Sequence, residues 1–226
     1  MKYKGLILDI DNTVYDYNIA NNIAKKSVLD FCENKFNIDR KLIIKAYDKA
    51  RKKVHIELSE TASSHNRLLY FQKMCEILDL NPLEYSFHIY NLYWDTFLDN
   101  MQTFDGIYEL LNMYKNNICL TTDLTADIQY RKIKKLKLDN YCSSIVTSEE
   151  AGREKPHPYM FMLSLRKLNL KVNEVCVIGD NFKKDIFGAR NLQIDAIWFN
   201  HDRKHEIFDD SNIGEINNFK EILKIV

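Results

Sequence analysis

The chain has 226 residues, of which 46% are hydrophobic, 28% are charged and 12% are aromatic, with only six glycines and three prolines. This composition excludes collagen-like, low-complexity and disordered classes, because the chain has enough apolar surface to form a core. Thirty-two basic residues balance thirty-two acidic ones, so the formal net charge is zero. Nothing in that balance favours nucleic acid or an anionic membrane as a partner.

The cysteines and the N-terminus predict a cytoplasmic protein. Five cysteines occur without a C-x-x-C pair, and an odd number does not fit a closed disulfide framework. The first apolar run is interrupted by Asp9 and Asp11, so it is too short and too acidic for a signal peptide or a membrane span. We therefore expect no membrane segment.

Apolar runs of strand length alternate with helical patterns along most of the chain. The runs show little polar alternation, which is typical of strands buried on both faces, and they cover residues 5–10, 117–122, 144–147, 174–179 and 194–199. Apolar residues at helical spacing lie between them, as at Ile107–Tyr114, Tyr130–Leu136 and Phe161–Leu168, where Pro158 would occupy the first turn. The alternation predicts an α/β fold, a three-layer Rossmann-like parallel sheet with helices on both faces.

One long segment departs from this alternation. Residues 15–103 contain no convincing strand but several helical stripes, for example Tyr90, Tyr93, Trp94 and Phe97. About ninety residues suffice for a small domain. We therefore predict an α/β core made of residues 1–14 and 104–226, with an all-helical domain inserted at 15–103.

The polar residues that follow the predicted strands would meet at one edge of a parallel sheet. They are Asp9, Asp11, Thr121, Thr122, Lys155, Asp180 and Asp185. Carboxylates gathered in this way repel one another unless a cation lies among them, and Mg²⁺ with oxygen ligands suits the set best. Lys155 and the Thr121 hydroxyl would hold phosphoryl oxygens. A carboxylate not used by the metal would act as nucleophile, and its neighbour as general acid and base.

Four motifs in this order resemble the haloacid dehalogenase superfamily, and specifically its phosphatase branch. The motifs are the D-x-D-x-T of residues 9–13, the strand ending in Thr121, Lys155-Pro156, and Gly179-Asp180 followed by Asp185. The helical insert matches, in position and size, the cap domain that the superfamily carries just after the first motif. The resemblance covers residues 1–14 and about 104–199.

The resemblance implies a role for each motif residue. Asp9 would attack phosphorus and become an aspartyl phosphate, while Asp11 would protonate the leaving group and later deprotonate water. Thr121 and Lys155 would stabilise the transferring group, with Thr122 as a further substrate contact. The Mg²⁺ ligands would be Asp9, the backbone carbonyl of Asp11, Asp180 and, directly or as an acidic support, Asp185.

The second motif departs from the family pattern. Family members often have Asn-Gly after the threonine, whereas this chain has Thr122-Asp123. Since a turn with positive φ accepts Gly or Asn more readily than other residues, we expect a different loop conformation at this point.

The insert should select the substrate, and Arg67 in its most polar stretch is the candidate contact; the alternative is a solvated loop between helices. We interpret Lys132, Lys134, Lys135 and Lys137 as a solvated helix face.

The expected function is Mg²⁺-dependent hydrolysis of a small phosphate monoester, a sugar phosphate or a nucleoside monophosphate, by a monomer or homodimer. Alternatives are a phosphomutase, a 2-haloacid dehalogenase, which usually lacks an acid at the position of Asp11, and a non-catalytic binding protein.

Overall fold

The computed structural model describes residues 2–222 and divides into two compact units. Of the described residues, 2–16 and 103–222 form one unit, and 17–102 form the other. No helix within the described residues is long and apolar enough to cross a membrane.

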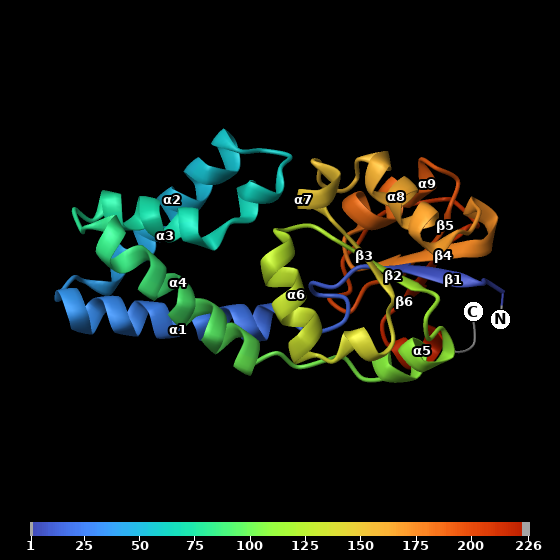
Figure 1. Ribbon diagram of the computed structural model, residues 1–226, viewed down its shortest axis with the longest axis horizontal. Coiled ribbons are helices and arrows are strands. Elements are labelled where there is room, and N and C mark those ends of the chain that lie inside the picture. The colour runs from blue at the N-terminus through green and yellow to red at the C-terminus, as the bar shows by residue number, and fades with distance from the viewer. Residues whose placement is uncertain (1, 223–226) are drawn as a thin grey trace. The chain divides into compact units, whose positions relative to one another are not determined.

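The first unit is built on a six-stranded, all-parallel sheet (Figure 1). Its strands are β1 (Gly5–Leu8), β2 (Ile118–Thr122), β3 (Ser144–Thr147), β4 (Val175–Gly179), β5 (Asp195–Phe199) and β6 (Ile213–Ile216). They lie in the order β3-β2-β1-β4-β5-β6, so β1 is central, flanked by β2 and β4. Every residue of these three strands is buried, as expected for strands covered on both faces.

Helices cover both faces of this sheet, which confirms the predicted three-layer α/β class (Figure 1). One face carries α7 (Ser148–Ala151), α8 (Pro158–Leu168) and α9 (Phe187–Arg190), and the other carries α5 (Ile107–Met113) and α6 (Ala126–Lys135); α10 (Phe219–Ile222) packs with α5. Shorter turns are η2 (Leu138–Asn140), η3 (Val172–Glu174) and η4 (Phe182–Ile186). Pro158 occupies the first turn of α8, as its fixed φ favours. Phe161 and Met160 of that helix pack on the sheet core.

Two features of this unit differ from the sequence interpretation. The runs at 5–10, 117–122, 144–147, 174–179 and 194–199 each contain a strand, but the sixth strand, β6, is not among those predicted. In the stripe predicted for α6, Ile133 and Leu136 are buried, but Tyr130 is 52% exposed. The residues that α6 buries are Ile128, Gln129, Lys132 and Ile133.

The second unit is entirely helical, as predicted for the insert. It consists of α1 (Tyr17–Phe36), α2 (Arg40–Glu57), η1 (Ala62–His65), α3 (Arg67–Ile77) and α4 (Pro82–Asp99). Asp39, Asn66 and Asn81 precede α2, α3 and α4, and each side chain accepts a hydrogen bond from the backbone N–H two residues later, which satisfies an otherwise unpaired donor. Tyr93, Trp94 and Phe97 of α4 are buried in its core.

Candidate active site

The carboxyl edge of the parallel sheet brings the motif residues together. Asp9 follows β1 directly, Thr121 and Thr122 end β2, and Asp180 follows β4. Since β2, β1 and β4 are adjacent and parallel, their ends lie side by side.

Lys155 links three of these positions. Its Nζ atom lies 2.6 Å from Oδ1 of Asp9 and 2.7 Å from Oδ1 of Asp185, and it also donates to the carbonyl oxygen of Thr121 at 3.0 Å. The lysine is 4% exposed. The other oxygen of Asp9 accepts the Thr13 hydroxyl at 2.9 Å, so the Asp9 carboxylate is held in a defined orientation.

Three carboxylates meet beside this lysine. One oxygen each of Asp9, Asp180 and Asp185 lies within 4.8 Å of the others. Burial raises the pKa of Asp9 to about 7, although Lys155 opposes the shift, and the nearby Asp185 adds to it. Burial and the charge of Asp9 raise the pKa of Asp180 to about 6. The cluster therefore favours a bound cation or proton.

The donor set fits Mg²⁺, which prefers carboxylate and carbonyl oxygens. Asn12 supports the fit, because its Oδ1 is buried without a hydrogen-bond partner while its Nδ2 donates to Asp180 Oδ2 at 2.9 Å. Both carboxylate oxygens of Asp185 already accept hydrogen bonds, Oδ1 from Lys155 and Oδ2 from the Asn181 backbone N–H at 3.0 Å. Asp185 is therefore suited to a supporting role in the acidic cluster.

Asp11 lies in a different environment from Asp9. Its Oδ1 accepts Lys132 Nζ at 2.6 Å and the Tyr15 hydroxyl, and its Oδ2 accepts Gln129 Nε2 at 2.8 Å. Burial opposes ionisation of Asp11, but the charge and hydrogen bond of Lys132 outweigh it and lower the pKa. The two aspartates of the D-x-D motif thus pair with different buried lysines, Asp9 with Lys155 and Asp11 with Lys132.

Lys132 corrects the sequence interpretation, which placed it on a solvated helix face. Its side chain is fully buried, because α6 turns Gln129 and Lys132 toward the end of β2 rather than toward water. Lys134, by contrast, is 70% exposed and pairs with Asp139. The sequence signal for the burial of Lys132 was its position between Ile128 and Ile133, the apolar residues that α6 buries.

The two threonines that end β2 face different partners. The Thr121 hydroxyl lies 2.6 Å from the Ser164 hydroxyl of α8, and its carbonyl accepts Lys155. The Thr122 hydroxyl accepts Gln129 Nε2 at 2.8 Å and donates to the Asp123 carbonyl at 3.1 Å. Gln129 therefore ties the Asp11 carboxylate to the end of β2.

The loop after β2 shows why this chain has an aspartate where the family often has glycine. The Asp123 carboxylate accepts the Lys155 backbone N–H at 3.0 Å and Lys184 Nζ at 2.7 Å. The positive φ occurs one residue later, at Leu124 (φ 91°). Asp123 thus fastens the segment that carries Lys155.

Gly179 permits the close approach of Asp185 to β4. A Cβ atom at residue 179 would lie 2.4 Å from the Asp185 carboxyl carbon, a distance at which one of the two must move. The motif therefore needs glycine at this position for lack of space.

Arg67, the candidate substrate contact, lies in the helical unit and is 7% exposed.

Comparison with known proteins agrees with the parallel sheet, its helical insert and the acidic cluster at its carboxyl edge. These features define an α/β fold of the haloacid dehalogenase type. A family model described as haloacid dehalogenase-like hydrolase matches residues 6–199. The chain therefore belongs to the haloacid dehalogenase-like hydrolase family.

Two curated relatives and one solved structure illustrate the similarity. The ribulose-1,5-bisphosphate 5-phosphatase of Halopiger xanaduensis is 30% identical over 200 residues, 86% of this chain and 84% of that protein. The glyceraldehyde 3-phosphate phosphatase of Pyrococcus furiosus is 26% identical over 234 residues, 99% of this chain and 94% of that protein. The magnesium-bound HAD-hydrolase YfnB of Bacillus subtilis covers 100% of this chain and 99% of its own, with a TM-score of 0.73 and 19% identity.

Proposed function

We propose that this protein is a Mg²⁺-dependent phosphatase that hydrolyses the monoester of a small sugar phosphate. Residues 1–14 and 104–226 would form the catalytic core, and residues 15–103 the cap that selects the substrate. The observation that carries the proposal is the pairing of Asp9 with Lys155 at 2.6 Å, with a second aspartate two residues away on a separate lysine. Two of the curated relatives are named for sugar-phosphate substrates, which favours this class over nucleoside monophosphates.

The first half of the reaction transfers the phosphoryl group to Asp9. A carboxylate oxygen of Asp9 attacks phosphorus, and the bond between phosphorus and the ester oxygen breaks. Although burial opposes the shift, Lys132 lowers the pKa of Asp11 in the free protein, so Asp11 takes up a proton when the phosphate dianion binds nearby. It gives that proton to the departing alkoxide, which leaves as an alcohol.

Lys155 faces the oxygens of the transferring group and holds the substrate phosphate. The contacts predicted for Thr121 and Thr122 would require their hydroxyls to leave Ser164 and the Asp123 carbonyl.

The second half regenerates the enzyme. Asp11, now ionised, takes a proton from a water molecule as that water attacks the phosphorus of the aspartyl phosphate. The bond between phosphorus and the Asp9 oxygen breaks, and inorganic phosphate leaves. The hydrogen bonds from Lys132 and Gln129 keep the Asp11 carboxylate aimed in the same direction through both halves.

Asp9, Asp180 and the Asp11 carbonyl would hold Mg²⁺, with Asp185 as a further acidic group. When bound, the ion neutralises the charge of the phosphate and of the carboxylates around it. Arg67 would contact the part of the substrate that does not react.

Phosphate release from p-nitrophenyl phosphate and from a panel of sugar phosphates and nucleotides tests the proposal. We expect release that EDTA abolishes and that the Asp9→Asn variant lacks. Halide release from a 2-haloacid would instead identify a dehalogenase, and phosphoryl return to a sugar without net phosphate release a phosphomutase. A folded protein inert toward the whole panel would point to a binding role.

A further inference from the structure

The helical unit contains a cavity of about 260 Å³ that neither the sequence motifs nor the proposed hydrolysis uses. All of the residues that line it belong to residues 17–102, so its geometry lies within one unit. Helices α1, α2, α3 and α4 each contribute to its wall. Cavities that bind drug-sized ligands measure about 300–1,000 Å³, so this one suits a smaller molecule, of the size of an amino acid.

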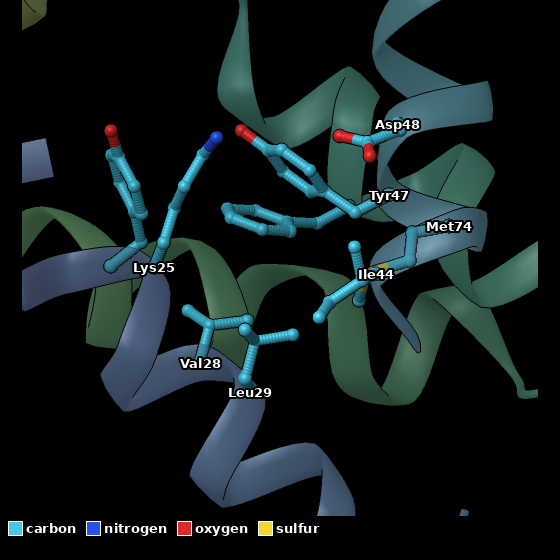
Figure 2. Close-up of a pocket in the computed structure, with 9 residues that line it drawn as sticks. Lys25, Val28, Leu29, Ile44, Tyr47, Asp48 and Met74 are labelled. Atoms are coloured by element: carbon cyan, nitrogen blue, oxygen red, sulfur yellow. The ribbon is translucent and has the colours of Figure 1, made fainter. Parts of the chain in front are cut away.

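Three polar side chains meet the cavity on one side. Figure 2 shows Lys25, Tyr47 and Asp48 with their polar ends toward the same side of the cavity. The Nζ atom of Lys25 lies 5.1 Å from the ring centre of Tyr47. Tyr47 is only 7% exposed, yet its hydroxyl forms no hydrogen bond with any residue that the structure describes. A buried hydroxyl without a partner costs free energy, so this hydroxyl is suited to a ligand.

Lys25 and Asp48 carry opposite charges, and neither forms an ion pair or a hydrogen bond within the described part of the chain. Both charges are therefore open to a ligand in the cavity. Burial lowers the pKa of Lys25, and the positive charges of Arg51 and Arg67 add to the shift, whereas Tyr17 and Asp48 oppose it. A ligand carboxylate beside Lys25 offsets this excess of positive charge. The anionic end of a ligand thus belongs beside Lys25, and a cationic end beside Asp48.

The other end of the cavity is apolar. Val28 and Leu29 of α1 lie there in Figure 2, and Phe71 and Met74 of α3 also line the cavity. Val28, Phe71 and Met74 are almost completely buried. The rings of Phe71 and Tyr47 pack with their centres 5.9 Å apart, which joins the apolar wall to the polar side. An aliphatic group placed at this end is removed from water.

We infer that this cavity binds a free aliphatic amino acid of about the size of leucine. Its carboxylate accepts hydrogen bonds from the Lys25 ammonium and the Tyr47 hydroxyl, and its ammonium pairs with Asp48. Its side chain lies against Val28 and Leu29. A fatty acid would leave Asp48 without a partner, and an amine would leave Lys25 without one. The site lies in the helical unit alone and does not depend on the proposed function.

Isothermal titration calorimetry of the full-length protein with L-leucine tests the site. We expect saturable binding with a Kd of about 1 mM or lower. Leucinamide lacks the carboxylate charge and N-acetylleucine lacks the ammonium, so each should bind at least about tenfold more weakly. Glycine has both charges but no side chain to bury, and it should also bind at least about tenfold more weakly.

Substitutions then assign each charge of the ligand to a residue. Lys25→Gln should weaken L-leucine binding about tenfold or more but hardly change leucinamide binding, because the amide offers the lysine no charge. Asp48→Asn should weaken L-leucine binding in the same way and hardly change N-acetylleucine binding. Lys25 is partly exposed and Asp48 is exposed, so both variants should fold, which a thermal melt checks. The matched control is Lys26→Gln, the next and exposed lysine of α1, which should keep the wild-type affinity.

L-Leucine that binds no more tightly than glycine would overturn the site. N-Acetylleucine that binds as tightly as L-leucine would overturn the amino-acid class, because the ammonium would then contribute nothing. Equal L-leucine affinities in the wild type, Lys25→Gln and Asp48→Asn would overturn the assignment to this cavity. Since no phosphate ester is present in the titration, its result is independent of whether the protein is a phosphatase.

Discussion

The Nζ atom of Lys132 lies 2.6 Å from Oδ1 of Asp11, and the lysine side chain is fully buried. This ammonium serves one aspartate of the D-x-D motif, while Lys155 serves the other. The arrangement lets two carboxylates only two residues apart keep different charge states. It also fixes the direction in which Asp11 can exchange a proton.

The first prediction concerns this ion pair. Lys132→Met keeps the length of the side chain but removes the ammonium, so the Asp11 carboxylate loses its fixed orientation. We expect kcat to fall about 10- to 100-fold for alkyl phosphates and much less for p-nitrophenyl phosphate, because a good leaving group needs little protonation. The measurement is kcat across a series of leaving groups.

Lys134→Met is the matched control, since Lys134 lies on the same helix but is 70% exposed. It should retain wild-type kcat for every leaving group. A thermal melt of both variants separates a folding defect from a catalytic one. Equal losses for good and poor leaving groups in a folded Lys132→Met protein would contradict the positioning of Asp11 by Lys132.

The sequence predicts most of this fold because burial leaves a clear pattern. Five runs without polar alternation correspond to β1–β5, each buried strand being apolar on both sides. The strand β6 reads Ile213-Gly214-Glu215-Ile216 and lies at the edge of the sheet, paired only with β5. So short and mixed a segment gives no distinct pattern.

The residues of the candidate site also fall into two groups, those that the sequence predicts and those that it does not. Asp9, Asp180 and Lys155 are predictable because polar residues at the ends of parallel strands must meet. Lys132 is not, because a lysine in a lysine-rich helix is ordinarily solvated, and only its position between Ile128 and Ile133 marks the buried face. The partner of a buried charge is a tertiary contact, in this case between residues 11 and 132, and sequence spacing does not specify it.

The second prediction separates the nucleophile from the metal ligand. Asp9→Asn should remove activity at every Mg²⁺ concentration, because an amide oxygen does not replace the attacking carboxylate. Asp180→Asn should mainly weaken Mg²⁺ binding, so high Mg²⁺ should restore part of the rate. Phosphate release is measured over a Mg²⁺ titration. Indistinguishable titrations for the two variants would argue against these roles.

The third prediction concerns the stability of the metal-free protein. Folding raises the pKa of Asp9 from 3.8 to about 7 and that of Asp180 from 3.8 to about 6. A carboxyl group whose pKa is higher in the folded state destabilises that state as pH rises from the unfolded value through the folded one. The metal-free protein should therefore lose stability between about pH 4 and pH 7 on account of this cluster.

Mg²⁺ should compensate most where the carboxylates are ionised. We expect the increase in Tm caused by Mg²⁺, relative to EDTA, to be several degrees larger at about pH 8 than at about pH 5.5. Taking the difference at each pH removes the contribution of other titrating groups. A gain in Tm that is as large at the lower pH as at the higher one would show that proton release from the cluster is not coupled to metal binding.

The last prediction tests the space beside β4. In Gly179→Ala the new methyl group would lie 2.4 Å from the Asp185 carboxyl carbon, so Asp185 should move and lose its 2.7 Å contact with Lys155. We expect kcat to fall by at least about tenfold, with a lower Tm, because a buried ion pair loses its geometry. Gly214→Ala is the matched control in the same sheet, since its methyl group would meet only Ile197, at 3.5 Å. A Gly179→Ala protein as active as Gly214→Ala would show that the contact between Asp185 and Lys155 is not needed for catalysis.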